Sequence, residues 1–125
     1  MKKLKFYRCA VCGNITIKLV DSGVPMFCCG QPMAEITANT TDAAQEKHVP
    51  VVTRNGENVE VKVGSVPHPM TEEHYIQFIA VKTTDKVHIC ELSPLSPPEA
   101  TFVFSNNEKI ENVFAYCNLH SLWQA

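Results

Sequence analysis

A cysteine and four histidines in this sequence combine residue types and spacing suited to binding a transition metal. The stretch Val113–His120 begins as an alternating apolar segment and ends with Cys117 and His120, three residues apart. That spacing lets a thiolate and an imidazole from one short loop face the same point. Three further histidines stand in or beside loop signals: His48, His68 and His74. Four imidazoles and one thiolate suit a mononuclear iron centre better than a structural zinc site, which is closed by four ligands.

Prolines flank two of these histidines. His68 lies between Pro67 and Pro69, and Pro50 follows two residues after His48. A proline ring restricts the backbone, so an imidazole beside it has little conformational entropy left to lose when it binds a metal. Together with the Cys-x-x-His pair, this placement at loops and strand ends favours a metal site over scattered surface positions.

His88 and Cys90 have a different setting. They lie two residues apart in a predicted strand, and hence on one face of it, with no turn or proline nearby. For both side chains the sequence predicts packing or surface placement rather than metal binding.

A second group of ligands lies near the N-terminus. Four of the six cysteines form two close pairs, Cys9 with Cys12 and Cys28 with Cys29. A Cys-x-x-Cys turn followed by a glycine, here Gly13, is typical of a metal knuckle, because the glycine permits the tight turn. Residues 15–20 alternate as a short strand and residues 21–23 form a turn. The resulting hairpin is expected to bring the second pair to the knuckle and complete a four-sulfur site.

The adjacent pair requires a bend in the backbone. Side chains of consecutive residues diverge along an extended chain, so Cys28 and Cys29 can bind one ion only where the chain turns. Gly30 and Pro32 just beyond tolerate or enforce such a bend. The spacing leaves iron and a closed structural zinc site as alternatives, and a vicinal disulfide at Cys28–Cys29 is a third.

Length and composition limit the class of protein. A chain of 125 residues makes one domain, or one domain with a small appendage, and with 45% hydrophobic residues it can bury a core without disulfides. The net charge of -2 argues against a binder of nucleic acid or of an anionic membrane.

The expected location follows from the N-terminus and the cysteines. Residues 1–8 have the basic start of a signal peptide without the apolar segment that should follow, and no apolar run is long enough to span a bilayer. We therefore expect a cytoplasmic protein, in which six cysteines indicate metal ligands before disulfides.

The remainder of the chain has the pattern of β-structure. Residues 38–47 are small and polar and are predicted to form a linker with one helical turn, capped by Thr41 or Asp42. Strands are predicted at 59–63, 75–82, 86–92, 101–105 and 113–117. Short strands separated by turn signals predict an antiparallel β-sandwich, immunoglobulin-like in outline.

Five motifs occur in order along nearly the whole chain. They are Cys9-x-x-Cys12-Gly13-Asn14, Cys28-Cys29-Gly30-x-Pro32-Met33, Glu46-Lys47-His48-Val49-Pro50, Gly64-Ser65-Val66-x-His68-Pro69-Met70 and Tyr116-Cys117-Asn118-Leu119-His120. Together they resemble desulfoferrodoxin, the two-iron form of superoxide reductase. The combination is far more specific than any one motif.

The resemblance implies two domains and two iron ions. Residues 1–37 would form a desulforedoxin-like Fe(Cys)4 domain, and residues 38–125 a superoxide reductase β-sandwich domain with an Fe(His)4(Cys) centre. The first iron would be bound by Cys9, Cys12, Cys28 and Cys29, with zinc as an alternative metal there. The second would have Cys117 as axial ligand and equatorial nitrogens from His48, His68, His74 and His120. His120 would bind through Nδ1 and the other three through Nε2.

The resemblance also implies an activity. The family reduces superoxide to hydrogen peroxide by one electron, with electrons from a small donor such as rubredoxin, as a homodimer that detoxifies superoxide under oxidative stress. In this reading Lys47 attracts superoxide and Glu46 becomes a sixth ligand to oxidised iron. One alternative is a metalloprotein in which both sites are closed and serve only electron transfer or structure. A third hypothesis is dismutation of superoxide.

Overall fold

The computed structural model describes residues 3–125, so the basic start at Met1 and Lys2 lies outside the described residues. The chain divides into two compact units, one ending at Thr37 and the other beginning at Ala38. Among the described residues, no helix has both the length and the apolar character needed to cross a membrane.

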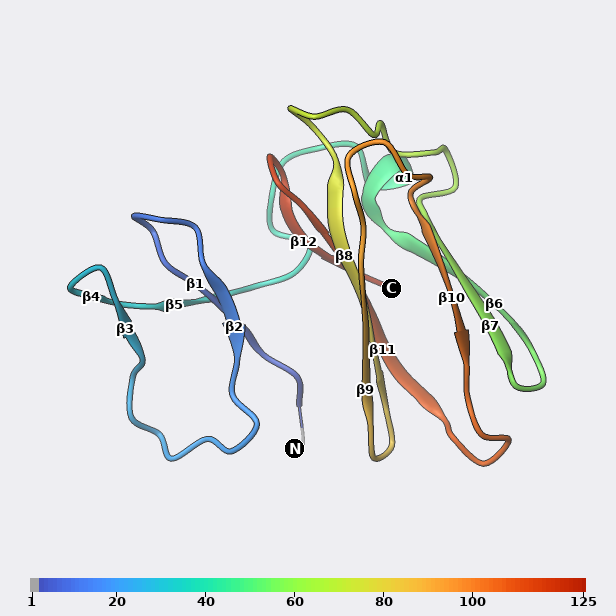
Figure 1. Ribbon diagram of the computed structural model, residues 1–125, viewed down its shortest axis with the longest axis horizontal. Helices are drawn as coiled ribbons and strands as arrows, with labels where there is room; N and C mark the ends of the chain where they lie inside the picture. The colour runs from blue at the N-terminus through green and yellow to red at the C-terminus, as the bar shows by residue number, and fades with distance from the viewer. Residues whose placement is uncertain (1–2) are drawn as a thin grey trace. The chain divides into compact units, whose positions relative to one another are not determined.

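The secondary structure consists of twelve strands and one short helix in the described residues (Figure 1). In the first unit the strands are β1 (Phe6–Arg8), β2 (Ile15–Ile17), β3 (Phe27–Cys28), β4 (Gln31–Pro32) and β5 (Ala34–Ile36). The second unit contains α1 (Gln45–His48), β6 (Pro50–Asn55), β7 (Asn58–Val63), β8 (Ile76–Thr83), β9 (Val87–Glu91), β10 (Glu99–Val103), β11 (Ile110–Cys117) and β12 (Ser121–Gln124).

The first unit is built from two small antiparallel sheets. Strand β1 lies between β2 and β5, and β3 pairs with β4. The predicted strand at 15–20 is shorter in the structure, ending at Ile17. Among the described residues of this unit, the buried apolar side chains are Leu4, Phe6 and Cys9. Such a small core gives little hydrophobic stabilisation, and domains of this size usually need a metal or a disulfide.

The second unit is a sandwich of a three-stranded sheet, β10-β7-β6, and a four-stranded sheet, β12-β11-β8-β9. Its core follows from the two-residue period of the strands. On β7 the buried positions are Val59, Val61 and Val63, and on β11 they include Val113 and Ala115. The prediction of a mainly β chain, with a small cysteine-bearing unit followed by an antiparallel sandwich, is confirmed.

The strand registers bring the loops that contain the predicted histidine ligands to one end of the sandwich. In Figure 1 this is the end at which α1 is drawn. The start of β6 pairs with the end of β7 at Pro50 and Val63. The end of β11 pairs with the starts of β8 and β12, because Cys117 lies opposite both Ile76 and Ser121. Loops before β6, between β7 and β8, and between β11 and β12 therefore meet at this end.

The helical turn in the linker was predicted correctly, but its capping residue is wrong. Helix α1 begins at Gln45, and its N-cap is Ala44, which makes no side-chain capping bond. The turn is held instead by contacts from a distant loop, since the carbonyl of Glu46 accepts the Val66 N–H at 2.9 Å. A tertiary contact of this kind overrides the local preference for Thr41 or Asp42 as a cap.

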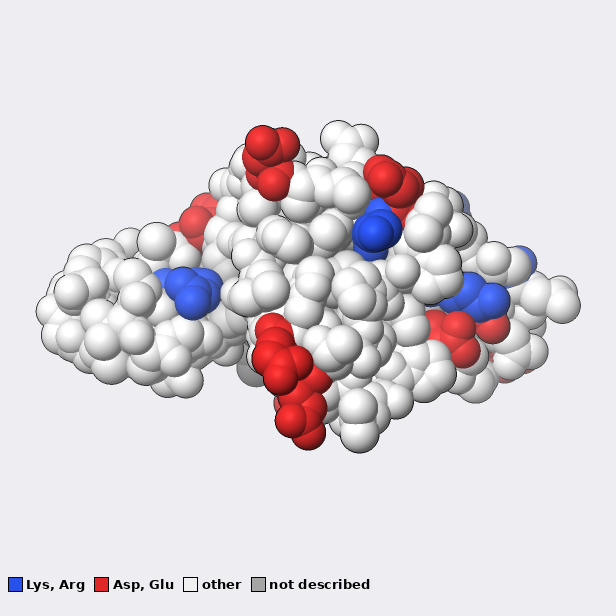
Figure 2. Space-filling model, turned by 90° about the horizontal axis from the view of Figure 1, so that it is seen from above, with Lys and Arg blue, Asp and Glu red and all other residues white. Residues whose placement is uncertain are grey.

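Charges are distributed in both signs over the surface. Figure 2 shows acidic and basic side chains in small separate groups on the face that it draws. This distribution agrees with the near-neutral net charge of -2. A strong field for a polyanion is therefore not expected on that face, while a local charge at one site can still act on a small anion.

Candidate metal centres

The four N-terminal cysteines converge on one point. Their sulfur atoms all lie within 4.8 Å of one another, with the Cys12 and Cys28 sulfurs 3.5 Å apart. Cys9 follows β1, Cys12 ends the knuckle and Cys28 belongs to β3, and the two pairs meet as predicted. The hairpin predicted to join them is wrong, because β2 pairs with β1, whereas β3 pairs with β4 in a separate sheet. The side-chain amide of Asn14 also donates to the Cys28 sulfur at 3.6 Å.

The backbone bend needed by the adjacent pair is present. Cys29 itself has a φ of 53°, and Gly30 follows with a φ of 74°. Two consecutive residues in the left-handed region turn the chain sharply, and this conformation is uncommon for a residue other than glycine. The Cys28 and Cys29 sulfurs are 4.0 Å apart, about twice the length of a disulfide bond, and both cysteines are free. The geometry excludes a vicinal disulfide.

The thiols of this group perturb one another. The Cys12 backbone N–H lowers the pKa of Cys9 to about 6, and contacts with Cys12 and Cys9 raise the pKa of Cys29 to about 12. One sulfur thus ionises readily while a second resists carrying another negative charge nearby. A bound cation removes this conflict, because it stabilises all four thiolates at once. The donor set and its geometry fit a tetrahedral iron or zinc ion.

Four imidazole rings form a closed circuit in the second unit. The ring of His48 lies 4.7 Å from that of His68 and 4.9 Å from that of His120, measured between centroids. His74 completes the circuit, at 4.7 Å from His68 and 5.1 Å from His120. Adjacent rings are nearly perpendicular, with interplanar angles from 75° to 84°. Such a circuit encloses one central point, with His48 opposite His74 and His68 opposite His120.

Hydrogen bonds determine which nitrogen atoms face that point. Nδ1 of His48 lies 2.7 Å from the Ala44 carbonyl, and Nδ1 of His68 lies 2.7 Å from the Pro69 carbonyl. Because a carbonyl only accepts, each Nδ1 carries the proton and each Nε2 keeps its lone pair. Nε2 of His68 and Nε2 of His74 are buried with no hydrogen-bond partner among residues 3–125. Two unsatisfied buried nitrogen atoms beside one point are the pattern that a metal ligand set leaves.

A sulfur atom lies beside the same point. The ligand atoms of Cys117, His48, His74 and His120 are all within 4.8 Å of one another. Cys117 is fully buried, because it continues the inward row of β11 that contains Val113 and Ala115. Burial raises the pKa of this thiol, whereas the N–H groups of Leu119 and His120 lower it. Those two donors stabilise a thiolate ligand.

Three of the four imidazoles have a lowered pKa, which favours the neutral form. Burial is the main cause that lowers the pKa of His48 and of His74, and the positive charge of Lys47 acts on both in the same direction. For His68, burial lowers the pKa to about 4. Neutral imidazoles offer lone pairs at pH 7, as metal binding requires. The residues present therefore fit an iron ion with four nitrogen ligands and one sulfur ligand.

The two residues predicted to act on the substrate lie next to this circuit. Glu46 and Lys47 belong to α1, the helix that ends at His48, and both side chains are exposed. The charge of Lys47 lowers the pKa of both His48 and His74, which lie on opposite sides of the circuit.

Sequence reasoning missed a tryptophan in the surroundings of the site. The indole of Trp123 stacks on His48, with centroids 4.8 Å apart, and its Nε1 donates to the His120 carbonyl at 2.9 Å. One buried side chain thus contacts two adjacent ligands. The position of Trp123, three residues after His120, was the available signal.

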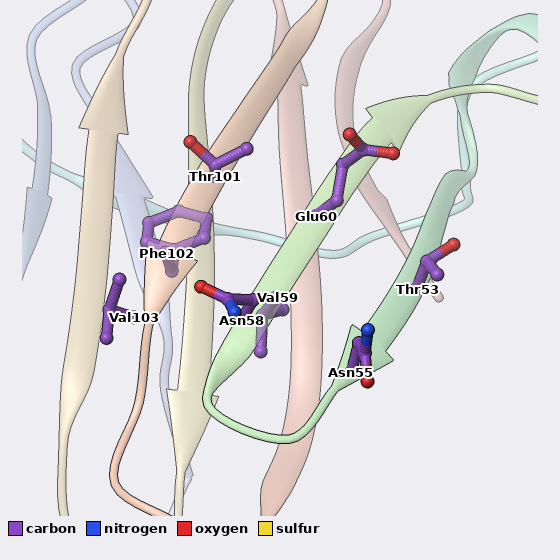
Figure 3. A pocket seen from close by; sticks show the side chains of 8 residues that line it. All are labelled: Thr53, Asn55, Asn58, Val59, Glu60, Thr101, Phe102 and Val103. Atoms are coloured by element: carbon purple, nitrogen blue, oxygen red, sulfur yellow. The ribbon is translucent and has the colours of Figure 1, made fainter.

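Other candidate residues and cavities lie apart from both groups. His88 and Cys90 belong to neither ligand group, and His88 pairs instead with the carboxylate of Glu108. A pocket of about 330 Å³ lies on the three-stranded sheet (Figure 3). It is lined by Thr53, Asn55, Asn58, Val59, Glu60, Thr101, Phe102 and Val103, a set with no cysteine or histidine.

Comparisons with known proteins agree with this geometry. Residues 1–36 match the family model described as the N-terminal domain of desulfoferrodoxin, and residues 40–125 match the model described as desulfoferrodoxin. A desulfoferrodoxin of Clostridium acetobutylicum is 50% identical over 113 residues, covering 90% of this chain and 88% of the relative. A desulfoferrodoxin homolog of Archaeoglobus fulgidus is 46% identical over 123 residues, covering 98% of this chain and 96% of the relative.

Solved structures have a similar fold. The superoxide reductase of Treponema pallidum superimposes with a TM-score of 0.83 at 35% identity, and 98% of each chain is covered. A one-iron superoxide reductase of Giardia intestinalis matches 64% of this chain and 95% of its own, with a TM-score of 0.56 at 33% identity.

The fold and the two ligand groups define a β-protein with two metal centres. The chain belongs to the desulfoferrodoxin family, since family models match residues 1–36 and 40–125. The four-cysteine group and the histidine–cysteine group match the two-iron arrangement of that family.

Proposed function

We propose that this chain is a superoxide reductase, an enzyme that reduces superoxide by one electron. The balanced reaction joins one superoxide anion, one electron and two protons to give one molecule of hydrogen peroxide. The observation that carries the proposal is the closed circuit of four imidazoles with the Cys117 sulfur beside it. Two solved structures with a similar fold are named superoxide reductases, and this supports the assignment.

The ligand sets follow from the two groups. We assign Cys9, Cys12, Cys28 and Cys29 to a first iron in a domain of residues 1–37, where zinc is the alternative metal. We assign His48, His68, His74, His120 and Cys117 to a second iron in a domain of residues 38–125. An octahedral iron ion held by these five residues would keep one position free for a small oxygen species and would supply one-electron reduction chemistry there.

Lys47 is assigned the task of attracting the substrate. Its side chain is exposed in α1, beside the ligand His48. A cation at the mouth of a site raises the local concentration of a small anion and increases its rate of arrival. An ammonium group also has three donors, enough to hold a water molecule from which a proton is delivered to the reduced oxygen species.

Glu46 is assigned the protection of the oxidised site. A carboxylate is a hard ligand and suits ferric iron better than ferrous iron. The side chain of Glu46 is exposed, whereas its carbonyl is held by Val66 N–H at 2.9 Å and by the Ser65 hydroxyl at 3.3 Å. Because the backbone carbonyl is held, a movement of the carboxylate toward a metal in this site would come from rotation of the side chain.

The decisive experiment combines metal analysis with stoichiometry. We expect iron-loaded protein to consume one external electron per superoxide and to produce hydrogen peroxide without oxygen. Production of oxygen from superoxide would instead show dismutation. A centre whose spectrum does not change with azide, and which reacts with no superoxide, would show a closed electron-transfer site.

Replacing Lys47 with alanine is expected to slow the second-order reaction with superoxide by about tenfold at low ionic strength. The reaction of the variant should also depend less on salt, because screening then has one fewer nearby charge to act on. Pulse radiolysis at several ionic strengths measures both effects. Lys62→Ala is the matched control, since Lys62 is exposed on β7 and pairs with Glu60 at 3.6 Å. Equal rates for the two variants would remove Lys47 from the mechanism.

Three further properties extend the proposal. We propose a small electron-transfer protein such as rubredoxin as the donor, and the cytoplasm as the location. We also propose a homodimer, because the first unit exposes several large apolar side chains, which are Val11, Leu19, Val20, Val24 and Phe27. Light scattering in solution tests the dimer, and a monomeric mass at micromolar concentration would contradict it.

A further inference from the structure

His74 differs from two of its fellow ligands in how its ring is supported. The Nδ1 atoms of His48 and His68 are each anchored by a backbone carbonyl at 2.7 Å. Within residues 3–125, the ring of His74 has no such carbonyl partner. A ligand normally relies on that second hydrogen bond to fix the orientation of its ring. The orientation of the His74 ring therefore depends more on how its backbone is held.

The backbone of His74 is held by Thr71. The Thr71 N–H donates to the His74 carbonyl at 2.9 Å, and the His74 N–H donates to the Thr71 carbonyl at 3.3 Å. The Thr71 hydroxyl adds to this by accepting the His74 N–H at 3.1 Å and donating to the His74 carbonyl at 3.3 Å. Both polar groups of the His74 backbone are thereby satisfied locally.

The peptide groups on either side of His74 are held by one amide from another loop. The side-chain Oδ1 of Asn118 accepts the Tyr75 N–H at 2.9 Å, and its Nδ2 donates to the Glu73 carbonyl at 2.9 Å. The backbone N–H of Asn118 also donates to the Tyr75 carbonyl at 3.2 Å. Asn118 directly follows Cys117, so the same residue is bonded to the loop of the sulfur ligand and to both neighbours of His74.

We infer that Asn118 is a positioning residue that sets the His74 imidazole relative to the Cys117 sulfur. This inference rests on the ligand assignment of the proposed function. One planar amide with a donor and an acceptor holds two peptide groups in a single orientation, which limits rotation of the segment between them. Through this bridge the loop before β8 and the loop after β11 move as one body, and the nitrogen and sulfur ligands keep a fixed separation.

The chain contains a matched control for this arrangement. The side chain of Asn39 makes a similar pair of bonds to a residue that is not a ligand of the circuit: its Nδ2 donates to the Gln124 carbonyl at 3.1 Å, and its Oδ1 accepts the Gln124 N–H at 2.9 Å. Replacing either asparagine with aspartate keeps the acceptor and removes the donor. The two variants therefore lose the same chemical interaction, but only one of them loses it beside His74.

The experiment compares Asn118→Asp with Asn39→Asp in the iron-loaded protein. We expect Asn118→Asp to release ferrous iron from the histidine–cysteine centre to an excess of chelator about 10- to 100-fold faster than the wild type. The thiolate-to-iron absorption band of its oxidised centre should also shift, since the angle between the ligands changes. Asn39→Asp should stay within about twofold of the wild type in release rate and keep the wild-type band.

Two results would overturn the inference. One is a wild-type rate of iron release and an unshifted band in Asn118→Asp. The other is equal acceleration in both variants, which would indicate a general loss of stability. If Asn118→Asp does not fold, Asn118→Ala removes both bonds without adding a charge, and Asn39→Gly is its control because Asn39 has a φ of 62°. Iron release is measured without superoxide, so an inactive protein would refute the proposed function and leave this comparison valid.

Discussion

Replacing Gly64 with alanine is expected to destabilise the second unit by about 3 kcal/mol and to release iron from the histidine–cysteine centre. A Cβ atom at this position would lie 2.8 Å from the backbone carbon of Glu46 and 2.8 Å from that of Lys47, and closer still to the Glu46 carbonyl oxygen. All of these atoms belong to the backbone of α1, so no flexible side chain can move aside. The φ of Gly64, +22°, adds strain for any residue with a Cβ.

The clash acts on the site because α1 has little freedom to retreat. Its Glu46 carbonyl is bonded to Val66 and Ser65, the two residues next to the one being changed. Pushing the helix away breaks these bonds and carries His48 with it, since that ligand is the last residue of α1. We expect both the site and the fold to be affected by one added methyl group.

Gly56→Ala is the control for this prediction. Gly56 also has a positive φ, +64°, but a Cβ placed there meets no atom within 4 Å. Its cost is limited to backbone strain of about 1 kcal/mol. Chemical unfolding followed by the fluorescence of Trp123, the single tryptophan of the chain, measures both variants, and metal analysis counts the iron. Equal losses of stability and of iron in Gly64→Ala and Gly56→Ala would show that the close approach of residue 64 to α1 does not affect stability.

The features that the sequence predicted well are those with local signals. Paired cysteines with glycines, histidines beside prolines, and strands of period two each depend on neighbours a few residues away. The two ligand groups and the sandwich therefore follow from spacing and from the family resemblance. The bend at Cys28–Cys29 was also expected, and the structure places Cys29 itself in the left-handed region.

The features that escaped prediction depend on contacts between distant segments. The start of α1 at Gln45 is determined by the loop after β7 rather than by a local cap. Trp123, near the end of the sequence of the second unit, stacks on His48, which lies near its beginning. The periodicity of one strand does not predict which side chain from another element will pack on a ligand, because this contact depends on the packing of the whole sandwich.

A buried carboxylate illustrates the same point away from the metal. The side chain of Glu108 is 1% exposed, and it bonds to the His88 ring and accepts the Ser105 hydroxyl at 3.3 Å. Lys86 lies 3.8 Å from the same carboxylate. The His88 ring in turn stacks on Phe104, with centroids 4.2 Å apart. Sequence reasoning predicted packing for His88, but it gave no signal that Glu108 would be its partner.

Glu108→Gln is expected to lower the free energy of unfolding by about 3 kcal/mol at pH 7, because it removes the negative charge that balances buried donors. Its pH dependence provides a second measurement. Burial raises the pKa of Glu108, but hydrogen bonds from His88 and Thr83 and the charges of His88 and Lys86 outweigh it, so the pKa falls to about 2 from its ordinary value of 4.5. A depressed pKa stabilises the fold above about pH 4.5, and this contribution is lost as the pH falls toward 2.

The difference in stability between wild type and Glu108→Gln should therefore be fully present above about pH 4.5 and should shrink steadily from pH 4.5 toward pH 2. Taking the difference removes the contributions of all other carboxylates, which titrate equally in both proteins. Glu60→Gln is the control, since Glu60 is 44% exposed in its side chain and pairs with Lys62 at the surface. Its effect should stay below about 1 kcal/mol because solvent screens an exposed pair. A difference that is independent of pH would show that the charge of Glu108 does not stabilise the fold.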